Sequence, residues 1–452
     1  MLTDFHMAKS LYDRDTSTNP VKRVLIITYY WPPSGGAGVQ RWLKFSKYLP
    51  AFGWEPIILT VDPKYANYPQ QDIGLLDDIP TDIIVHYAKA STWISFIYKK
   101  ITGKKEIPYG GFVNESNPGL VQKLMRFIRG NFFIPDSRIG WNKHAIRYAL
   151  KVIKEEHIET IITTSPPHST QLIGLRLKKK LKINWVADLR DPWSDIYYSG
   201  EMYQTFLAKR INRILEQKVL NSADKIFVTC NSTGNLFKSQ IADIHSSVKI
   251  LTITNGFDED DYINKEIVVQ DKFTITYLGT FAKNYNIEVL LKAINHYAYS
   301  DEININLRFI GKVDEYLAEY LKGYPLISIE IIPYIEHKRA LRYLARSSAL
   351  LLVIPSKSKA EEMIPGKFFE YMASKRPIIA IGPGESDVAE ILKITNSGRI
   401  FENTDYEALI EYLNELVTNF KKGHFENNPR LLDQYSRKNL SMRIASILDS
   451  IS

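Results

Sequence analysis

The most restrictive feature of this chain is the order of its apolar segments, in which short β-rich runs alternate with helical patterns. The first run, residues 24–30, is followed by a glycine-rich loop at residues 32–38 and then by apolar residues at helical spacing to about residue 51. A second β-rich run begins at Trp54. Strand, helix and strand in this order predict a parallel sheet with right-handed crossovers.

The alternation occurs twice along the chain, once from residue 21 and again from about residue 272. With 452 residues the chain is long enough for two or three domains with sizeable cores. We therefore expect an α/β fold of two doubly wound, Rossmann-like domains that face each other across a cleft and share one ligand. We place a disordered tail at residues 1–20, an N-terminal domain at 21–262, a C-terminal domain at 270–430 and a last helical segment at 431–452.

The composition excludes several classes of protein. The single cysteine, Cys230, lies in an apolar run, so we expect no disulfide framework and a reducing, cytoplasmic compartment. No apolar run approaches 18 residues, which argues against a membrane-spanning helix. The first 20 residues are polar and mixed, and they lack the apolar centre of a signal peptide.

Positive charge is concentrated in one segment of the N-terminal half. Residues 97–150 contain ten Lys or Arg against three Asp or Glu, within a net charge of +8. Residues 120–134 have the pattern of a basic amphipathic helix that runs into aromatic residues, and such a helix suits anionic lipid headgroups. An ordinary surface helix with solvated lysines explains the same pattern. We expect no nucleic-acid partner, because no recognisable binding module accompanies the charge.

Two carboxylates eight positions apart, Glu362 and Glu370, stand near the C-terminus at a strand–loop–helix junction. A buried β-rich run at residues 349–354 precedes them, and Pro365 and Gly366 open the helix that holds the second. The start of such a helix offers free amide donors and a positive dipole end to an anion. Carboxylates beside that point can hold sugar or ribose hydroxyls next to a phosphate. The segment therefore favours a sugar-nucleotide site, although two unrelated surface glutamates would give the same spacing.

Several short motifs, in a fixed order over about residues 22–450, resemble the family 4 glycosyltransferases, which are retaining enzymes of the GT-B fold. The resemblance implies a nucleoside-diphosphate sugar as donor, catalysis without a metal cofactor, and a last helix that packs back on the N-terminal domain. The motifs are PPSGG at 32–36, ADKIFVT at 223–229, TNGFD at 254–258, YLGT at 277–280, FIGK at 309–312, the pair Glu362 and Glu370, and PIIAIG at 377–382.

The resemblance assigns donor-binding roles to residues of both halves. Gly36 would let the backbone of the N-terminal domain approach the donor diphosphate, where a Cβ atom would block it. A plain tight turn is the other explanation of this glycine. Glu370 would hold the ribose hydroxyls, and Glu362 would lie beside the transferred sugar and its developing positive charge. The backbone of Tyr334 and Ile335 would read the base.

Two departures from the family pattern concern the donor phosphates. Family members usually have Phe-Gly after the first glutamate, whereas Pro365 here has no amide to give. They also have an arginine directly after the glycine of the first C-terminal strand, and Thr280 stands at that position. Lys367 and Lys283 are then the candidate phosphate ligands. Each could equally be an ordinary solvated lysine.

The N-terminal half offers candidates for catalysis and for acceptor binding. His168 follows a buried β-rich run, where the family often has a histidine that can donate to a hydroxyl or phosphate oxygen. Residues 188–195 concentrate charges and a tryptophan at a strand end. Asp191 or Asp188 would lie near the attacking hydroxyl. A loop histidine, a helix N-cap and an Arg–Asp pair are the structural alternatives. The acceptor-binding candidates are Asp188, Arg190 and Trp193, and the catalytic candidates are Glu362, His168 and Asp191.

We therefore predict a retaining glycosyltransferase that moves a sugar from a UDP- or GDP-type donor to a hydroxyl of a glycan or lipid-linked acceptor, in cell-surface polysaccharide or glycolipid synthesis. We expect no metal, because Asp258-Glu259-Asp260 spells the D-x-D motif of other glycosyltransferases but falls in the interdomain linker. We place the enzyme in the cytoplasm, at the inner face of the cell membrane. The alternatives are a sugar-nucleotide epimerase and an inactive sugar-nucleotide-binding protein. The missing arginine after Gly279 favours the inactive protein.

Overall fold

The computed structural model describes residues 22–69, 71–91, 119–195, 202–241, 249–262, 272–282, 285–300, 303, 305–313, 315–355, 364–424 and 427–452. Four subjects of the sequence predictions lie outside these ranges, namely the tail at residues 1–20, residues 97–118 of the basic segment, Lys283 and Glu362. Within the described residues, no helix is long and apolar enough to cross a membrane.

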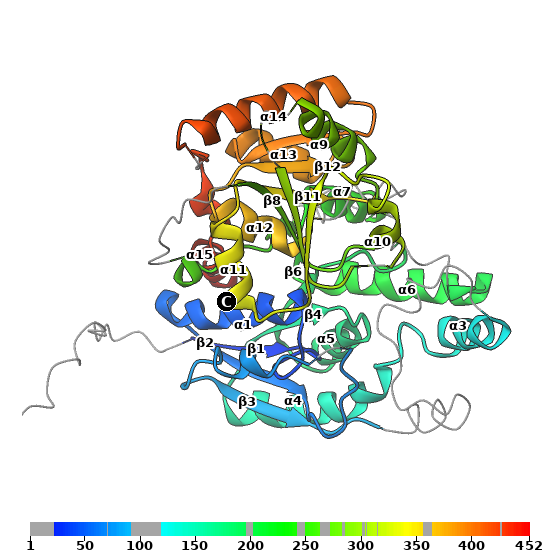
Figure 1. Cartoon of the computed structure of the whole chain (residues 1–452). Coiled ribbons are helices and arrows are strands. Elements are labelled where there is room, and N and C mark those ends of the chain that lie inside the picture. The colour runs from blue at the N-terminus through cyan, green and yellow to red at the C-terminus, as the bar shows by residue number, and fades with distance from the viewer. Residues whose placement is uncertain are drawn as a thin grey trace, which may run out of the picture.

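The N-terminal half forms a seven-stranded sheet in the order β3-β2-β1-β4-β5-β6-β7 (Figure 1). Every pair of neighbouring strands is parallel. The strands are β1 (Lys22–Ile27), β2 (Trp54–Val61), β3 (Ile84–Ala88), β4 (Thr160–Ser165), β5 (Asn184–Leu189), β6 (Lys225–Val228) and β7 (Ile250–Thr252). The helices of this half are α1 (Ala37–Tyr48), α3 (Leu120–Phe132), α4 (Asn142–Glu155), α5 (Ser169–Lys180), α6 (Phe206–Ser222) and α7 (Asn231–Gln240).

The C-terminal half forms a second parallel sheet, with six strands in the order β10-β9-β8-β11-β12-β13. The strands are β8 (Phe273–Leu278), β9 (Ile305–Ile310), β10 (Ser328–Ile332), β11 (Ala349–Val353), β12 (Ile378–Ile381) and β13 (Gly398–Phe401). The helices are α9 (Glu288–Ser300), α10 (Glu315–Leu321), α11 (His337–Ala345), α12 (Gly366–Ala373), α13 (Asp387–Thr395), α14 (Tyr406–Lys421) and α15 (Arg437–Asp449).

Both sheets are covered on both faces, which explains why their central strands are continuous apolar runs. Successive side chains of a strand point to opposite faces. On β1, Leu25 and Ile27 accordingly belong to one core cluster, and Val24 and Ile26 belong to another. Alternate residues of β11 divide between two clusters in the same way. The predicted architecture of two doubly wound, Rossmann-like domains is therefore confirmed.

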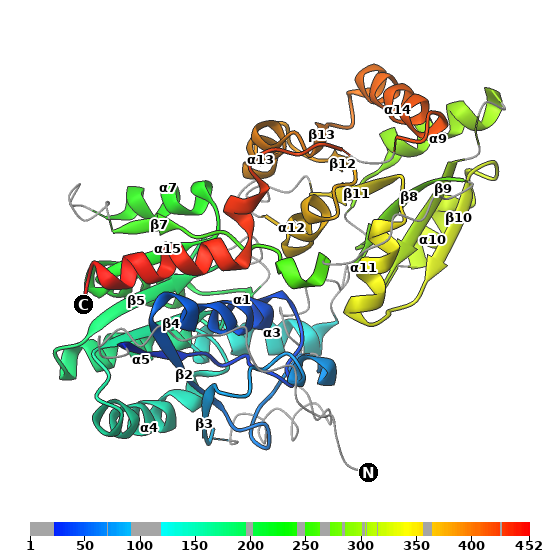
Figure 2. The ribbon, with the colours of Figure 1, turned by 90° about the vertical axis from the view of Figure 1, so that its left-hand side faces the viewer.

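The last helix of the chain returns to the N-terminal half, where α15 lies alongside α1 (Figure 2). Its buried residues Leu440, Ile444 and Leu448 belong to the same core cluster as Trp42 and Phe45 of α1. Burial of three large aliphatic side chains stabilises this arrangement by several kcal/mol, at about 1.5–3 kcal/mol each. The two halves are consequently linked through a shared core as well as through the chain between them.

Candidate active site

Each sheet has one topological switch point, where the chain leaves two neighbouring strands in opposite directions. In the N-terminal sheet this point lies between β1 and β4, and the loops after these strands carry Gly36 and His168. In the C-terminal sheet it lies between β8 and β11. The chain after β8 carries Gly279, and the chain after β11 leads into α12 with Lys367. Ligands of doubly wound sheets bind at such points, so four residues singled out by sequence or geometry lie at expected binding positions.

Lys367, in the first turn of α12, points at the end of β8. Its Nζ donates to the carbonyl of Leu278 at 2.9 Å and lies 3.6 Å from the centroid of the Tyr277 ring. A Cβ atom added to Gly279 would be 3.8 Å from this nitrogen. Burial lowers the pKa of Lys367 to about 7, although the nearby Glu370 acts in the opposite direction. Within the described residues the amine forms no ion pair, so an anion bound here would stabilise its charged form.

Glu370 lies one turn further along α12 and is held by a histidine that the sequence analysis did not single out. Nε2 of His337, the first residue of α11, is 3.0 Å from Oε1 of Glu370. Burial opposes the charged imidazolium, but the hydrogen bond and the charge of Glu370 outweigh it, so the pKa of His337 is raised. Lys44 of α1 lowers the same pKa slightly, which places α11 close to the N-terminal domain. The predicted ribose ligand is therefore already oriented by a partner.

The glycine-rich loop after β1 needs glycine at two positions, at Gly36 for its backbone conformation and at Gly38 for a close contact. Gly36 has a φ of +100°, which L side chains rarely adopt, and its Cβ direction meets no described atom within 4 Å. Gly38 lies against the guanidinium of Arg190, because an added Cβ would stand 2.3 Å from Nη1 of that arginine. Arg190 also contacts Asp191, with Nη2 at 3.2 Å from Oδ2. A predicted acceptor residue and the predicted catalytic Asp191 thus lie beside the predicted diphosphate loop.

His168 and Trp193 form a stacked pair, with ring centroids 5.3 Å apart and planes inclined by 13°. His168 is buried, and neither ring nitrogen has a hydrogen-bond partner among the described residues. Burial lowers its pKa, against the opposing charges of Asp136 and Asp191. The indole nitrogen of Trp193 donates to Asn212 of α6 at 3.0 Å. Buried polar atoms without partners are rare in folded proteins, so His168 is the better candidate of the two for contact with a substrate.

Asp188, a predicted acceptor-binding residue, lies in the interior of the described structure. Its side chain is fully buried, and its oxygens accept from Arg41, Trp42 and Thr164. The ion pair with Arg41 is 2.8 Å long, and the remaining donors of that arginine reach the carbonyls of Ile253 and Thr254. Both oxygens are therefore occupied inside the protein. The sequence placed Asp188 correctly at the end of β5 but could not reveal that α1 would cover it.

Tyr334 and Ile335 follow β10 in the loop that leads to α11. Tyr334 is exposed and Ile335 is half-buried, so this loop is accessible at the edge of the C-terminal sheet. The charge of Asp72, from the N-terminal domain, contributes to raising the pKa of Tyr334 after the effect of burial. The predicted base-reading segment therefore lies close to both domains.

The D-x-D triplet contributes to the connection between the domains. Asp258 forms ion pairs with Lys44 at 2.9 Å and Lys47 at 3.1 Å, and Lys47 also pairs with Asp260 at 2.6 Å. Burial acts to raise the pKa of Asp258, but Lys44 and Tyr48 lower it to about 2. Among the described residues, no group of three or more His, Cys, Asp or Glu side chains is arranged to hold a metal ion.

Arg437 and Arg41 are buried arginines that the sequence analysis did not single out. Arg437 is the first residue of α15, and its guanidinium lies 5.0 Å from the centroid of the Phe45 ring. Burial and the nearby charge of Arg41 lower its pKa to about 9, against the opposing charges of Asp258 and Glu370. Its Nη1 has no hydrogen-bond partner in the described part of the chain. Neither arginine lies in a recognisable motif, so no local sequence signal could have identified them.

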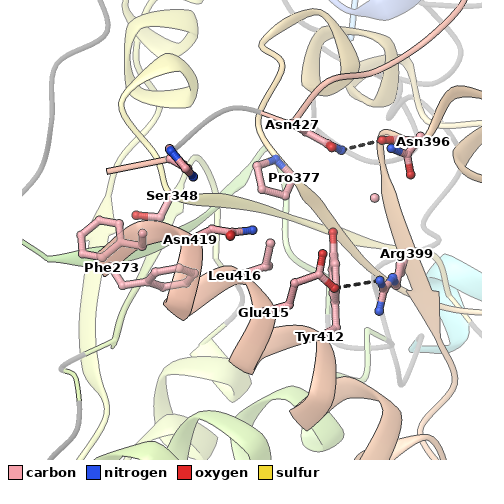
Figure 3. A pocket seen from close by; sticks show the side chains of 13 residues that line it. Phe273, Ser348, Pro377, Asn396, Arg399, Tyr412, Glu415, Leu416, Asn419 and Asn427 are labelled. Atoms are coloured by element: carbon pink, nitrogen blue, oxygen red, sulfur yellow. Dashed lines mark hydrogen bonds and ion pairs between the residues drawn. The ribbon is translucent and has the colours of Figure 1, made fainter. Parts of the chain in front are cut away.

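A small cavity of about 110 Å³ lies at the amino ends of the strands of the C-terminal sheet, opposite the candidate active site (Figure 3). Phe273 and Gly398, which line it, are the first residues of β8 and β13, so the cavity opens at the amino ends of the strands. An ion pair of 2.8 Å between Arg399 and Glu415 crosses its wall. Because ligands of such sheets bind at the carboxyl ends, this cavity is separate from the candidate active site.

The comparisons with known proteins agree with this geometry. Residues 258–438 match the family model for glycosyl transferases group 1, and this segment contains the whole C-terminal sheet. No curated protein is significantly similar to the chain in sequence. Among solved structures, sucrose-phosphate synthase from Thermosynechococcus elongatus aligns over 95% of this chain and 98% of its own, with 13% identity and a TM-score of 0.61.

Two further structures resemble the chain. Anabaena HepE, solved in complex with UDP and glucose, aligns over 95% of this chain and 100% of its own, with 12% identity and a TM-score of 0.58. A putative UDP-N-acetylglucosamine 2-epimerase from Listeria monocytogenes aligns over 95% and 96%, with 13% identity and a TM-score of 0.53. Identities this low show a common fold and no more. That fold is the two-domain GT-B fold, and the family match over the C-terminal domain supports a glycosyltransferase.

Proposed function

We propose that this chain is a retaining glycosyltransferase of family 4 that takes its sugar from a nucleoside-diphosphate sugar. The observation that carries the proposal is the buried amine of Lys367 beside Gly279, at the switch point of the C-terminal sheet. A diphosphate would supply the anion that this amine lacks among the described residues. The first turn of α12 adds free amide donors and the positive end of the helix dipole.

The rest of the donor would extend from this phosphate site in two directions. Glu370 is oriented by His337 through Oε1, and its second oxygen, Oε2, has no partner among the described residues and would accept from a ribose hydroxyl. The loop with Tyr334 and Ile335 would contact the base. On the other side, the open space at Gly36 would admit the diphosphate to the N-terminal domain. In this proposal Lys283 is a second phosphate ligand and no resident metal is required.

The proposed reaction keeps the configuration of the sugar because the acceptor attacks from the face that the diphosphate leaves. The bond between the anomeric carbon and the β-phosphate oxygen breaks, and a bond to the acceptor oxygen forms. The acceptor proton passes to the leaving phosphate. Lys367 and the α12 dipole stabilise the negative charge of the leaving group. Glu362 stabilises the positive charge that develops on the sugar, and Asp191 lies near the attacking hydroxyl.

His168 has a separate role in this proposal. Because burial lowers its pKa, the imidazole is neutral near pH 7 and has one N–H to donate and one nitrogen to accept. Both nitrogens lack partners among the described residues, so a sugar hydroxyl can satisfy either of them. The stacked Trp193 keeps the ring in place.

The proposed acceptor is a hydroxyl of a glycan or lipid-linked molecule in the synthesis of a cell-surface polysaccharide or glycolipid. The basic helix α3 supports a location at the inner face of the cell membrane, because its three basic residues are accompanied by no acidic residue between 119 and 134. UDP is the first nucleotide to test, because a protein of the same fold was solved with it.

Thermal unfolding in the presence of UDP, GDP, ADP, CMP and their common sugars, with and without EDTA, tests the donor site. A nucleotide that binds the native state at 100 times its Kd stabilises it by about 2.7 kcal/mol. We expect one nucleotide to raise the melting temperature in EDTA, and Glu370→Gln to reduce the shift. Glu407→Gln, on the exposed surface of α14, is the matched control and should keep the full shift.

Two results would contradict the proposal. The absence of a shift with every nucleotide would remove the donor site, and a shift that EDTA abolishes would require a metal. Analysis of the sugar product then addresses the reaction itself. Transfer with inverted configuration would exclude the retaining mechanism, and consumption of donor without any acceptor would favour an epimerase.

A further inference from the structure

The described surface has one concentration of exposed apolar side chains, on the adjoining helices α3 and α6. Nine of the 19 large hydrophobic residues that are exposed in the described part of the chain lie on these helices and on the turn before α6. Five of them are 55 to 85% exposed, namely Leu120, Leu124, Phe132, Phe206 and Leu207. Scattered exposed apolar residues are normal in proteins, whereas a concentration of them marks an interaction surface.

The two helices are fixed to each other by hydrogen bonds as well as by proximity (Figure 1). Nδ2 of Asn131, near the end of α3, donates to the carbonyl of Tyr203 at 3.1 Å. Oδ1 of the same residue accepts from the backbone N–H of Thr205, the N-cap of α6, at 2.7 Å. We call the exposed residues of α3, of α6 and of the turn before α6 the α3–α6 face.

The charge of the α3–α6 face is almost entirely positive. Six basic residues on the two helices reach the solvent: Lys123, Arg129, Lys209, Arg210, Arg213 and Lys218. The single acidic residue on these helices, Glu216, is buried on the opposite side of α6. On α6, Leu207 and Ile211 are one turn apart and form an apolar stripe beside Arg210. Apolar stripes flanked by Lys and Arg are typical of helices that lie in the interface of an anionic bilayer.

We propose that the α3–α6 face docks on an anionic lipid bilayer, with α6 and α3 lying in the headgroup region. The charge favours this occupant over a second copy of the chain, because two identical positive faces repel each other. Anionic headgroups attract the basic side chains, of which Arg213 also pairs with Asp195 at 3.3 Å, and the apolar side chains between them enter the boundary of the acyl chains.

The inner side of α6 connects this face to the candidate acceptor site. Asn212 accepts from the indole nitrogen of Trp193 at 3.0 Å, and Glu216 accepts from the backbone N–H of Ser194 at 3.3 Å. Trp193 in turn stacks on His168. The helix that contacts the bilayer therefore also holds the stacked pair. This step rests on the proposed function: an acceptor whose hydroxyl lies at the membrane surface would reach His168 without leaving the bilayer.

Flotation of the full chain with vesicles tests the proposal. We expect binding to vesicles of phosphatidylcholine mixed with phosphatidylglycerol, and weak or no binding to phosphatidylcholine alone. Replacement of two apolar residues, Phe206→Ser with Leu207→Ser, should weaken binding at least about tenfold. Reversal of charge by Lys209→Glu with Arg210→Glu should weaken it about fivefold or more for each charge, and raised salt should have the same effect.

Matched controls lie on exposed positions of the C-terminal domain. Leu326→Ser with Ile331→Ser removes two exposed apolar side chains, and Lys421→Glu with Lys422→Glu reverses two exposed charges. Both controls should bind vesicles as tightly as the unaltered chain. Equal binding by all variants, or no binding of the unaltered chain to anionic vesicles, would overturn the proposal. So would a dimer in solution that the Phe206→Ser, Leu207→Ser pair dissociates, because the face would then be an interface between copies.

Nucleotide binding and transfer separate this proposal from the proposed function. The Phe206→Ser, Leu207→Ser variant should keep its melting-temperature shift with UDP and its transfer to a water-soluble acceptor, and lose transfer to an acceptor embedded in vesicles. Equal loss of transfer to both acceptors would mean that α6 has a purely structural role. No nucleotide shift in the unaltered chain would overturn the proposed function while leaving the vesicle result intact.

Discussion

Two cations, the buried Arg41 in the N-terminal domain and the half-buried Lys367 in the C-terminal domain, have opposite surroundings. Arg41 on α1 is fully buried, and its guanidinium is paired with Asp188 and with the carbonyls of Ile253 and Thr254. Lys367 on α12 is half-buried, and its amine has one carbonyl and one aromatic ring as partners and forms no ion pair within the described residues. The charge of Arg41 is neutralised within the protein, whereas the charge of Lys367 would be neutralised by a bound anion.

This difference separates a structural charge from a candidate ligand-binding charge. A buried charge costs free energy unless a partner compensates it. Burial lowers the pKa of Lys367 to about 7, because no described residue supplies the compensating ion pair. The local sequence does not distinguish the two cases, because both residues lie in a helix that follows a parallel strand and its loop.

Asp188→Asn should have the largest effect on stability. It removes the negative charge of the pair and leaves Arg41 charged in the interior, which costs about 3–5 kcal/mol of the free energy of unfolding. Urea denaturation measures this loss. The double variant Arg41→Met with Asp188→Asn removes the isolated charge and should recover part of the stability. A stable Asp188→Asn protein that has lost activity with the acceptor would instead restore the predicted acceptor-binding role.

Lys367→Met should have the opposite effect to Asp188→Asn, because it should leave the stability intact and weaken nucleotide binding. The substitution removes a buried amine that lacks an anionic partner, so the free energy of unfolding should stay the same or rise. Loss of a charged hydrogen-bond donor to a diphosphate, at about 1.5–3 kcal/mol, should weaken UDP binding about 10- to 100-fold. Calorimetric titration measures the affinity. Lys393→Met, at an exposed position of α13, should change neither quantity.

The pH dependence of stability sharpens the same comparison. The pKa of Lys367 is lowered from 10.5 to about 7 in the native state, so between these pH values the unfolded chain binds more protons than the native chain. The contribution of Lys367 to stability should therefore rise with pH over this window, by at most about 1.4 kcal/mol per pH unit. Nucleotide affinity should fall over the same window, because the diphosphate prefers the charged amine.

The difference between the unaltered chain and Lys367→Met, measured from pH 7 to 10, isolates this contribution from the other titrating groups. Parallel stability curves for the two proteins would mean that the amine is paired in solution. Nucleotide affinity that is equally independent of pH in both proteins would mean that the diphosphate binds elsewhere.

Strands and helices could be predicted from the sequence because the signals are local. Continuous apolar runs such as Val24–Ile27 and Leu350–Val353 fit a sheet buried on both faces, and glycine-rich loops mark the turns into helices. Lys367 was identified from the family resemblance, and the structure places it in the first turn of a helix that follows a buried strand. Such a position has the same chemistry in any doubly wound domain.

The surroundings of charged residues could not be predicted in the same way. Asp188 is separated by 147 positions from Arg41, and His337 by 33 positions from Glu370. Which charges meet depends on how α1, α11 and α12 pack, and no local pattern records that packing. The exposed stripe of α6 was missed for a related reason, because amphipathic periodicity shows that a helix has two faces but not which one the fold covers.

A buried carboxylate at the contact between the two domains, Asp387, gives the smallest expected effect. Asp387, the first residue of α13 in the C-terminal domain, accepts from the backbone N–H of Asn231 at 2.9 Å and from Ser232, at the start of α7 in the N-terminal domain. It therefore caps a helix of the other domain. Asp387→Asn keeps the shape but removes the charge that interacts with the helix dipole, and should cost about 0.5–1 kcal/mol in thermal unfolding. Ser386→Ala removes a cap within α13 itself and has a similar expected cost.

If Asp387→Asn also changes nucleotide affinity while Ser386→Ala does not, the contact between the domains contributes to donor binding. Equal nucleotide affinities of the two variants would mean that the charge of Asp387 is purely structural, like that of Asp188.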